Sequence, residues 1–346
     1  MAHQLLKPTP LKPGDKVAIL SPAWSAPSYF PQIHRQAMER VEKLLGLEPV
    51  EYPTTSKMGA SPKERAEDVN AAFADPEIRA IFTTIGGDDE ITVTPHLDSQ
   101  LPKADPKPFF GYSDNTNISN WLWQNGVGSY YGGSTMVHLG PAQVDEEHLT
   151  TLKAALFAEG DLQLPIPTES EDFGHDWSSP AALDQPYPRT PSPKLEFLAS
   201  DEKVRGATWG GCLEVIDQLA LADRLPSAEQ IEGKILLFET SEIIPPPEYV
   251  GRWIRALGQR GYLDAASALA FAQPVVADRD NPMPPEILAA KHEAYVEYLL
   301  ANIAPYRSDL LVCLNLPFGH TRPQLVLPYG GEITLDPKTE TVTAHY

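Results

Sequence analysis

The chain has 346 residues, of which 42% are hydrophobic, enough to bury a sizeable core. At about 100–200 residues per domain, this length favours two domains over a single large α/β domain. Asp and Glu number 47 against 27 Lys and Arg, which gives a formal net charge of −20. A surface this acidic repels phosphate backbones and anionic lipid headgroups, so we expect neither nucleic acid nor a membrane as a partner.

The N-terminal and cysteine patterns are typical of a cytoplasmic protein. Residues 1–16 contain no apolar segment of the kind a signal peptide needs, and no window of the sequence approaches the ~18 apolar residues of a membrane helix. Cys212 and Cys313 are too few for a disulfide framework, and no cluster of His, Cys and Asp has zinc-binding spacing. We therefore expect a reducing compartment and no metal site.

In the first half of the chain, strand patterns alternate with helix patterns. The expected strands are Lys16–Ser21, Ile78–Ile85 and Pro108–Ser113, and the expected helices are 31–46, Pro62–Phe73 and Asn117–Gln124. Gly46 is a suitable C-cap for the first of these helices. Such alternation predicts a mostly parallel sheet covered by helices.

Residues 161–200 differ in character, because they contain seven prolines and show no periodicity. They predict a long connection without secondary structure that lies over the surface. Beyond it, strands are expected at Lys234–Glu239, Ala266–Ala272 and Leu310–Leu316, and helices at Leu213–Ala222, Glu248–Arg260 and Pro285–Leu300. The sequence thus predicts an α/β protein with domains at 1–160 and 205–346, joined by a Pro-rich connector at 161–204.

A serine lies where the third expected strand turns into a helix, in Gly111-Tyr112-Ser113-Asp114. A sharp turn of this kind exposes the hydroxyl of Ser113, and the backbone N–H groups that follow can stabilise an oxyanion. The second glycine of the usual G-x-S-x-G pattern is absent, since Asn115 occupies its position. The alternative interpretation is that Ser113 is an ordinary helix N-cap.

Two glycines end the expected strand before it, in Ile85-Gly86-Gly87-Asp88-Asp89. Glycine lets the backbone approach a ligand closely, so these residues could donate N–H groups to an oxyanion. The acidic residues that follow argue against a phosphate cradle. A simple turn at the end of a strand fits the pattern equally well.

Two further candidates follow strands of the second half. Glu239 ends a buried apolar run, at the carboxyl edge where open α/β sheets place functional groups, and Glu242 is a second candidate carboxylate three residues later. His320 follows a Pro-Phe-Gly turn after the strand Leu310–Leu316. Each could instead have only a structural role. Together, Ser113, Glu239 and His320 would supply a nucleophile, an orienting carboxylate and a general base.

Cys212 is the alternative nucleophile, because it follows Trp209-Gly210-Gly211 at the expected start of a helix. A helix N-terminus lowers the pKa of a thiol and so activates it. The competing interpretation is that a small residue packs where two glycines bring backbone segments together.

These motifs, in this order, resemble the LD-carboxypeptidase family of serine peptidases, and within it the microcin C immunity peptidases. The resemblance runs nearly from end to end. It includes the opening strand Leu11–Pro22, the turn Ile85–Asp89 and the segment Phe110–Asp114, followed by Gly210-Gly211, Leu237–Glu239, Gly319-His320 and Leu327–Gly330. The LD-carboxypeptidase branch itself typically has an Arg-Gly-Gly-Tyr-Gly turn where this chain has Ile85–Asp89, and this difference favours the microcin branch.

The resemblance implies a catalytic triad of Ser113, Glu239 and His320, with the backbone N–H groups of Gly87 and Asp114 as oxyanion donors. It also implies a Rossmann-like N-terminal parallel-sheet domain and a smaller C-terminal α/β domain, with the site between them. It implies a homodimer and no metal or organic cofactor.

The substrate expected from the microcin branch is a peptidyl or aminoacyl nucleotide. There, an aromatic residue of the interdomain loop stacks on the nucleotide base, and Trp177 lies in the matching loop, with Gly86 as a second substrate-binding residue. One alternative substrate is a murein tetrapeptide with an L,D bond. A second alternative is a ligand-binding protein of the same fold that does not use the triad.

Overall fold

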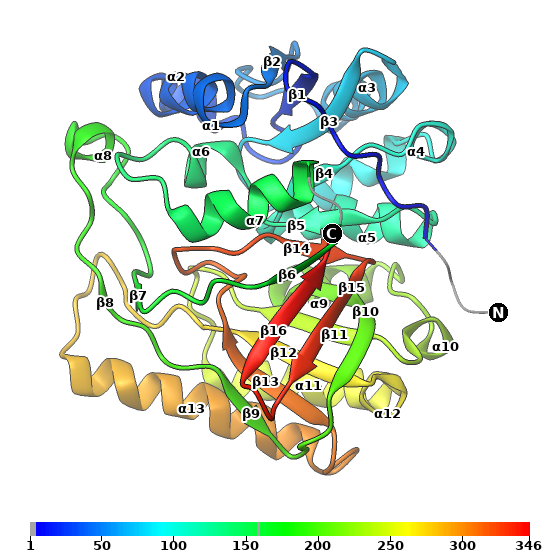
Figure 1. Ribbon diagram of the computed structural model, residues 1–346, viewed down its shortest axis with the longest axis vertical. Coiled ribbons are helices and arrows are strands. Elements are labelled where there is room, and N and C mark those ends of the chain that lie inside the picture. The colour runs from blue at the N-terminus through cyan, green and yellow to red at the C-terminus, as the bar shows by residue number, and fades with distance from the viewer. Residues whose placement is uncertain (1–4, 158–159) are drawn as a thin grey trace.

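The computed structural model describes residues 5–157 and 160–346, which form two β-sheets with helices packed around them (Figure 1). Residues 1–4, which begin the stretch where the sequence predicts no signal peptide, lie outside this description. The blue-to-cyan N-terminal part and the yellow-to-red C-terminal part lie at opposite ends of the long axis, and the green connector runs along one side. The two sheets meet in the middle of the molecule.

The first sheet has the strand order β14-β5-β4-β3-β1-β2. Its strands are β1 (Lys16–Leu20), β2 (Glu48–Glu51), β3 (Ile78–Thr83), β4 (Phe109–Gly111), β5 (Ser129–Tyr131) and β14 (Leu327–Tyr329). All neighbours are parallel except β14, which pairs antiparallel with β5 although it comes from the end of the chain. The last part of the chain therefore completes the sheet of the first part.

The helices of this part vary in length. They are α1 (Ala26–Tyr29), α2 (Pro31–Arg40), α3 (Pro62–Ala74), α4 (Leu101–Ala104), α5 (Thr116–Gln124), α6 (Thr135–His138) and α7 (Glu146–Phe157). Shorter turns occur at η1 (Val41–Leu45), η2 (Glu90–Thr92), η3 (Thr94–His96) and η4 (Ser113–Asn115). Helix α3 begins with a capping box, in which Ser61 and Glu64 satisfy each other's backbone N–H groups.

The second sheet has the order β6-β16-β15-β10-β11-β12-β13-β9. Its strands are β6 (Asp161–Gln163), β9 (Glu196–Leu198), β10 (Val204–Cys212), β11 (Ile235–Glu239), β12 (Ala268–Ala272), β13 (Leu311–Leu316), β15 (Glu332–Asp336) and β16 (Thr341–His345). The four central strands β10 to β13 are parallel and almost wholly buried, as expected when both faces of a sheet are covered. Its helices are α9 (Leu213–Leu221), α10 (Ala228–Ile231), α11 (Pro247–Gln259), α12 (Tyr262–Ala265) and α13 (Pro285–Ile303).

The predicted fold class, a parallel-sheet N-terminal part with a second α/β part, is confirmed by the two sheets and by the structural comparisons given below. All the expected strands and helices exist, with shifts of a few residues at their ends. The helix expected at 31–46 is α2 followed by the π-helical turn η1, and Gly46 ends it with a φ of 67°. The domain boundaries 1–160, 161–204 and 205–346 stay a prediction.

The expectation that residues 161–200 lack secondary structure is wrong. Strands β6 and β9 occupy opposite edges of the second sheet, β7 (Glu169–Ser170) pairs with β8 (Thr190–Pro191), and α8 (Ala181–Asp184) lies between them. These strands have only two or three residues each, too few to show a period of two. Strands β6 and β9 are defined by pairing with β16 and β13, which are distant in the sequence, and β7 and β8 are defined by pairing with each other.

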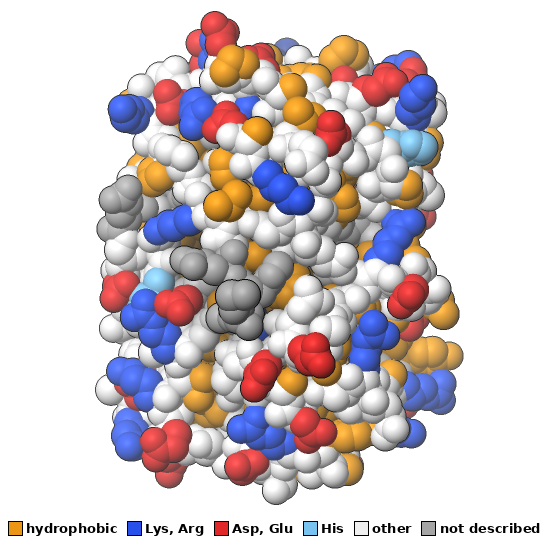
Figure 2. Space-filling view, turned by 90° about the vertical axis from the view of Figure 1, so that its right-hand side faces the viewer, with side chains coloured by type: hydrophobic (Ala, Val, Ile, Leu, Met, Phe, Trp, Pro, Cys, Tyr) orange, Lys and Arg blue, Asp and Glu red, His pale blue; other side chains and the backbone are white. Residues whose placement is uncertain are grey.

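Within the described residues, no helix combines the length and the apolar character needed to cross a membrane. On the face drawn in Figure 2, acidic and basic side chains are interspersed rather than gathered into one patch. The excess of acidic residues is therefore not concentrated on this face.

Gly210 offers a direct test of how tightly β10 packs on β11. A Cβ atom at this position would lie 1.9 Å from the carbonyl oxygen of Leu237. We expect Gly210→Ala to destabilise the protein by roughly 3 kcal/mol or more, because backbone atoms cannot yield as a flexible side chain does. Urea unfolding measures the effect.

Gly233→Ala is the matched control. Gly233 has a φ of 71°, but a Cβ atom there would have no neighbour within 4 Å, so only the left-handed backbone strain of about 1–2 kcal/mol applies. Equal losses in the two variants would show that the close approach of β10 to β11 does not limit stability.

Candidate active site

A cleft of about 250 Å³ lies where loops of the two sheets meet. Its walls come from the turns that follow β1, β3 and β4, from the connector, and from the loops that follow β11 and β13. It is lined by Trp24, Ile85, Gly86, Gly87, Tyr112, Ser113, Val137, Asp172, Phe173, Gly174, His175, Trp177, Glu242, Arg279, His320 and Arg322. The carboxyl ends of parallel strands are the usual place for a site in such folds.

Ser113 sits on a strained turn directly after β4. Its φ is 61°, a left-handed conformation that is unusual for a residue with a side chain and is typical of functional turns. The Asn115 amide donates to the carbonyl oxygens of Ile85 and Tyr112, at 3.2 and 3.0 Å, and so fixes the turn. A Cβ atom on Gly111 would lie 2.8 Å from the Cβ of Asn115, which explains why glycine stands two residues before the serine.

The glycine turn after β3 faces Ser113. A Cβ atom on Gly86 would lie 3.0 Å from the Oγ of Ser113 and 3.2 Å from the backbone nitrogen of Asp114. A Cβ atom on Gly87 would lie 2.9 Å from the Cβ of Ala23. Both positions therefore require glycine because of close approach, and the turn lies against the first residues after the serine.

The acidic residues that follow the glycine turn tie it to its surroundings. Asp89 forms a two-point ion pair with Arg65, with both N–O distances 2.7 Å. The backbone N–H of Glu90 donates to the Oδ2 of Asp114 at 3.0 Å, which connects the glycine turn to the serine turn. Burial, opposed by this hydrogen bond, raises the pKa of Asp114 to about 6.

Glu239 and His320 form a buried pair beside the cleft. The Nδ1 of His320 lies 2.6 Å from the Oε2 of Glu239, whose residue has 0% exposed surface. The hydroxyl of Tyr131, at the end of β5, donates to the other oxygen, Oε1, at 2.6 Å. Burial, together with Glu239, raises the pKa of Tyr131 well above its ordinary value, so the phenol keeps the proton that it donates.

A chain of hydrogen-bond donors from both parts of the protein supports this pair. Because Tyr131 gives its single proton to Glu239, the hydroxyl of Thr116 must donate to the Tyr131 oxygen, at 3.3 Å. The backbone N–H of Cys212 in turn donates to Thr116 at 3.2 Å, and that of Ser113 donates to Tyr131 at 3.3 Å. The oxygens of Glu239 are thus satisfied by groups from both sheets.

Cys212 does not meet the requirements of a nucleophile. Its side chain is buried, and the thiol donates to Oε2 of Glu214 at 3.2 Å. Burial first, then the neighbouring carboxylates Glu239 and Glu214, raise the pKa of Cys212 well above its ordinary value. The thiol therefore keeps its proton, and the packing interpretation is the one that the surroundings favour.

The loop that carries His320 is held by one buried amide. The Nε2 of Gln324 donates to the carbonyl oxygens of Phe318 and Gly319, at 3.2 and 2.8 Å. Its Oε1 accepts from the backbone N–H of Gly133 at 3.2 Å. The ring of Tyr112 lies 4.9 Å from the His320 ring, centroid to centroid.

Trp177 lines the cleft and also packs against the first part of the chain. Its ring meets that of Phe30 edge to face at 5.5 Å, and Trp24, which is 38% exposed, lies 6.1 Å from Phe30. The cleft is therefore lined by a second indole, Trp24, besides the Trp177 predicted from the sequence, and the two form its aromatic rim. Two arginines, Arg279 and Arg322, supply positive charge to the same cleft.

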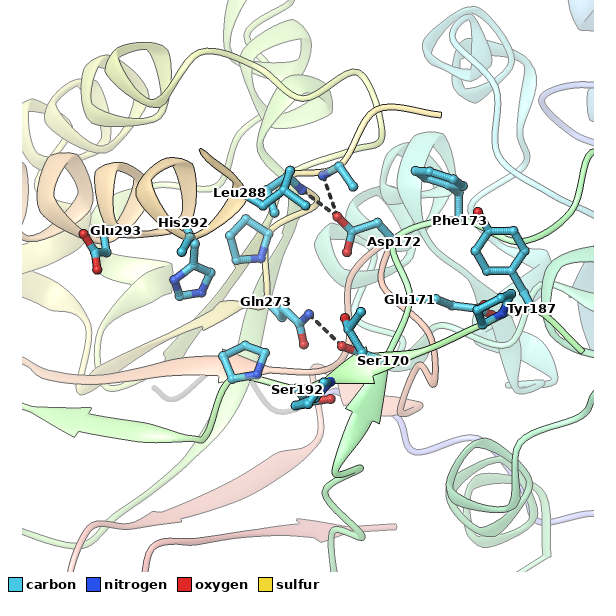
Figure 3. Close-up of a pocket in the computed structure, with 18 residues that line it drawn as sticks. Ser170, Glu171, Asp172, Phe173, Tyr187, Ser192, Gln273, Leu288, His292 and Glu293 are labelled. Carbon is cyan, nitrogen blue, oxygen red and sulfur yellow. Dashed lines mark hydrogen bonds between the residues drawn. The ribbon is translucent and has the colours of Figure 1, made fainter. Parts of the chain in front are cut away.

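A larger cavity, of about 520 Å³, lies beside the cleft and shares Asp172 and Phe173 with it (Figure 3). Backbone N–H groups of Val276 and Ala277 donate to Asp172, and Gln273 donates to Ser170. None of the site residues predicted from the sequence lines this larger cavity. Size alone therefore does not identify the site of chemistry.

The structure brings all the predicted site residues to one region, with Ser113, Gly86, Gly87, His320 and Trp177 on the cleft wall, Asp114 beside them, and Glu239 beneath. Sequence reasoning missed Tyr131, Asn115, Gln324 and the two arginines. Tyr131 and the two arginines have their partners far away in the chain, so no local motif reveals them. Asn115 and Gln324 bond residues close to them in the sequence, but each also bonds a distant segment, at Ile85 and Gly133. Among residues 5–157 and 160–346, no group of three or more His, Cys, Asp and Glu side chains is arranged to hold a metal ion.

Comparison with known proteins connects this arrangement to a family. Residues 17–132 match the LD-carboxypeptidase N-terminal domain, and residues 205–335 match the LD-carboxypeptidase C-terminal domain. A Vibrio cholerae protein named "Putative carboxypeptidase" is 28% identical over 332 residues, which cover 93% of this chain and 92% of the relative.

Two further relatives differ in their named roles. The microcin C7 self-immunity protein MccF of Escherichia coli is 26% identical over 365 residues, covering 100% of this chain and 97% of MccF. A Bacillus subtilis protein named "Probable murein peptide carboxypeptidase" is 25% identical over 346 residues, covering 97% of this chain and 93% of that protein.

Solved structures share the whole fold. An MccF-like protein from Streptococcus pneumoniae in complex with AMP has a TM-score of 0.83 at 25% identity, covering 96% of this chain and 99% of that one. MccF in complex with glutamyl sulfamoyl guanosine has a TM-score of 0.82 at 22% identity and covers 98% of both chains. With both family domains present in order and the fold shared from end to end, the chain belongs to the LD-carboxypeptidase family.

Proposed function

We propose that the protein is a serine peptidase that hydrolyses an amide bond near the carboxyl end of a small peptide conjugate. The observation that carries the proposal is the buried Glu239–His320 hydrogen bond of 2.6 Å, in the same cleft as a serine with a φ of 61°. A carboxylate that orients an imidazole, in a cleft that also holds a serine on a strained turn, supplies the three groups that acyl transfer requires.

In the first half of the reaction, the hydroxyl of Ser113 attacks the carbonyl carbon of the scissile amide while the Nε2 of His320 takes its proton. Glu239 holds Nδ1–H, which fixes the tautomer and stabilises the imidazolium that forms. Negative charge develops on the carbonyl oxygen, and the backbone N–H groups of Gly87 and Asp114 receive it. Asp114 lies in the first turn of η4, where backbone N–H groups have no acceptor within the helix.

In the second half, the imidazolium of His320 returns its proton to the leaving nitrogen, and the amide bond breaks. Water then attacks the ester on Ser113, with His320 again taking and returning a proton. The chain's own residues are sufficient for this sequence of steps, and the proposal includes no metal and no organic cofactor.

We infer that the substrate is a peptidyl or aminoacyl nucleotide. The aromatic rim of Trp24 and Trp177 offers faces on which a base can stack. Among the structural neighbours, MccF was solved in complex with glutamyl sulfamoyl guanosine and the MccF-like protein in complex with AMP. Self-immunity or detoxification is the role that such a substrate suggests. The proposal includes a cytoplasmic location and a homodimer, and sedimentation of the purified protein tests the homodimer.

The second candidate substrate is a murein tetrapeptide, which would give the protein a role in cell-wall recycling. The Bacillus subtilis relative named "Probable murein peptide carboxypeptidase" favours it, as does the half-exposed Arg279 in the cleft, which suits a free carboxylate. Incubation with both substrate classes, with products identified by mass spectrometry, decides between them.

Ser113→Ala should abolish turnover and leave the fold intact, because it removes the nucleophile from a turn that Asn115 holds. Only the residual rate of ~10³–10⁴-fold over water should remain. A fluorophosphonate probe applied above pH 9, where the imidazole of His320 is neutral, should label the wild-type protein at Ser113 and should not label the variant, as read by mass spectrometry.

Cys212→Ala serves as the control and should keep most of the turnover and all of the labelling. Turnover by Ser113→Ala combined with an inactive Cys212→Ala would instead identify the cysteine as the nucleophile. A folded wild-type protein that resists the probe and cleaves neither substrate would be a ligand-binding protein.

Glu239→Gln should lower kcat by on the order of 10⁴-fold, since an amide cannot hold His320 in the required tautomer or stabilise its charge. Steady-state kinetics of Glu239→Gln and Glu242→Gln compare the two carboxylates. They are measured above pH 9, because the carboxylates beside His320 outweigh its burial and raise its pKa to about 9. We expect a much smaller change in kcat for Glu242→Gln, and the reverse ranking would mean that Glu242 is the orienting carboxylate.

Trp177→Ala should lower kcat/KM for an aminoacyl nucleotide by on the order of 5- to 150-fold, mainly through KM, if the indole stacks on the base with ~1–3 kcal/mol. Hydrolysis of a tetrapeptide that has no base should hardly change. Equal losses on both substrates would show that Trp177 supports the loop through Phe30 rather than contacting the base.

A further inference from the structure

Glu242 makes a contact with His320 that the proposed mechanism does not use. Its Oε2 lies 3.1 Å from the Nε2 of His320, the nitrogen that must accept the proton of Ser113. The Glu242 side chain is 67% exposed and lines the cleft, whereas Glu239, on the other ring nitrogen, is fully buried. The imidazole therefore lies between one buried and one exposed carboxylate.

This arrangement holds His320 in its protonated form. An imidazole that faces a carboxylate at each nitrogen donates through both, and so it cannot accept a proton. Burial lowers the pKa of His320, but Glu239, then Glu242 and Glu214, outweigh it and raise the pKa to about 9. Tyr112, His138 and Arg322 also lie near the ring, and none of them is an anion at neutral pH that could replace Glu242.

Glu242 is also the carboxylate of the cleft that is most available to a ligand. Asp172, the other acid that lines the cleft, already accepts the backbone N–H groups of Val276 and Ala277 at 2.9 and 2.7 Å. The arginines of the cleft have other partners, since Arg322 faces Glu171 at 3.5 Å and Arg279 faces Asp176 at 3.8 Å. Within the described chain, His320 is the cation that Glu242 meets.

We propose that Glu242 is the receptor for an ammonium group of the substrate and that binding of this group releases His320 for catalysis. The inference rests on the proposed function and names a feature of its substrate. A carboxylate beside Nε2 must lie close to the carbonyl that Ser113 attacks. The α-ammonium group of an aminoacyl substrate is one carbon away from that carbonyl, so it can reach Glu242 while the carbonyl faces Ser113.

The exchange of partners is balanced in charge. Glu242 leaves one cation, His320, and pairs with another, the substrate ammonium. With one carboxylate fewer beside it, His320 releases the Nε2 proton to water and can then accept the proton of Ser113. A peptidyl substrate, whose amine is acylated, offers no cation. Glu242 then stays on His320 for most of the time, and hydrolysis at neutral pH is slower than that of an aminoacyl substrate.

The test compares aspartyl sulfamoyl adenosine with its Nα-acetyl derivative on the wild-type protein and on Glu242→Gln. A hydrogen bond between charged groups predicts that the wild-type kcat/KM is roughly ten- to hundredfold higher for the free amine at neutral pH. Glu242→Gln should reduce this preference to near one. Glu248→Gln, an equal charge change on an exposed residue outside the cleft, is the control and should keep the preference.

NMR titration of His320 gives a readout that does not depend on turnover. The midpoint should lie near pH 9 in the wild-type protein and clearly lower in Glu242→Gln, with the signal assigned by its loss in His320→Gln. An unchanged amine preference in Glu242→Gln, or an unchanged midpoint, would overturn the inference. If the wild-type protein cleaves nothing and resists the fluorophosphonate probe even above pH 9, the proposed function fails instead, whatever the titration gives.

Discussion

The structure of the candidate site depends on one buried carboxylate. Glu239 has no exposed surface, and an unpaired charge in such a position would cost several kcal/mol. Its two oxygens are satisfied by Tyr131, from the first sheet, and by His320, from the loop after β13 in the second sheet. Because the partners come from different sheets, the same hydrogen bonds that stabilise the carboxylate also hold the two halves of the cleft together.

The remaining geometry follows from bringing backbone segments close to this carboxylate. Tyr131 also accepts the backbone N–H of Ser113, so the serine turn is connected to the Glu239–His320 pair through a single phenol oxygen. Gly86 allows the neighbouring turn to lie against the serine, where any larger residue would meet Ser113 within 3 Å. The glycines and the strained turn are thus consequences of close approach. They need not be read as signs of flexibility.

Local sequence was sufficient to predict the elements that present functional groups. Ser113, Glu239 and His320 each follow a strand with a strong apolar pattern, and strands β4, β11 and β13 are where that pattern indicates. It was insufficient wherever the deciding contact is distant. The short strands β6 and β9 form only because β16 and β13 offer edges, and Tyr131 matters only because Glu239 lies beside it, 108 residues later. Glu242 was singled out as a rival of Glu239, and in the structure the two carboxylates face opposite nitrogens of the same ring.

The central claim is that Ser113, His320 and Glu239 act as one unit with the glycine turn. A crystal structure of the protein after reaction with a fluorophosphonate above pH 9, where His320 is neutral, tests it most directly. We predict a covalent bond at the Oγ of Ser113, the phosphonyl oxygen ~2.7–3.1 Å from the backbone nitrogens of Gly87 and Asp114, and His320 still held by Glu239. An adduct on another residue, or a phosphonyl oxygen that points away from both nitrogens, would contradict the claim.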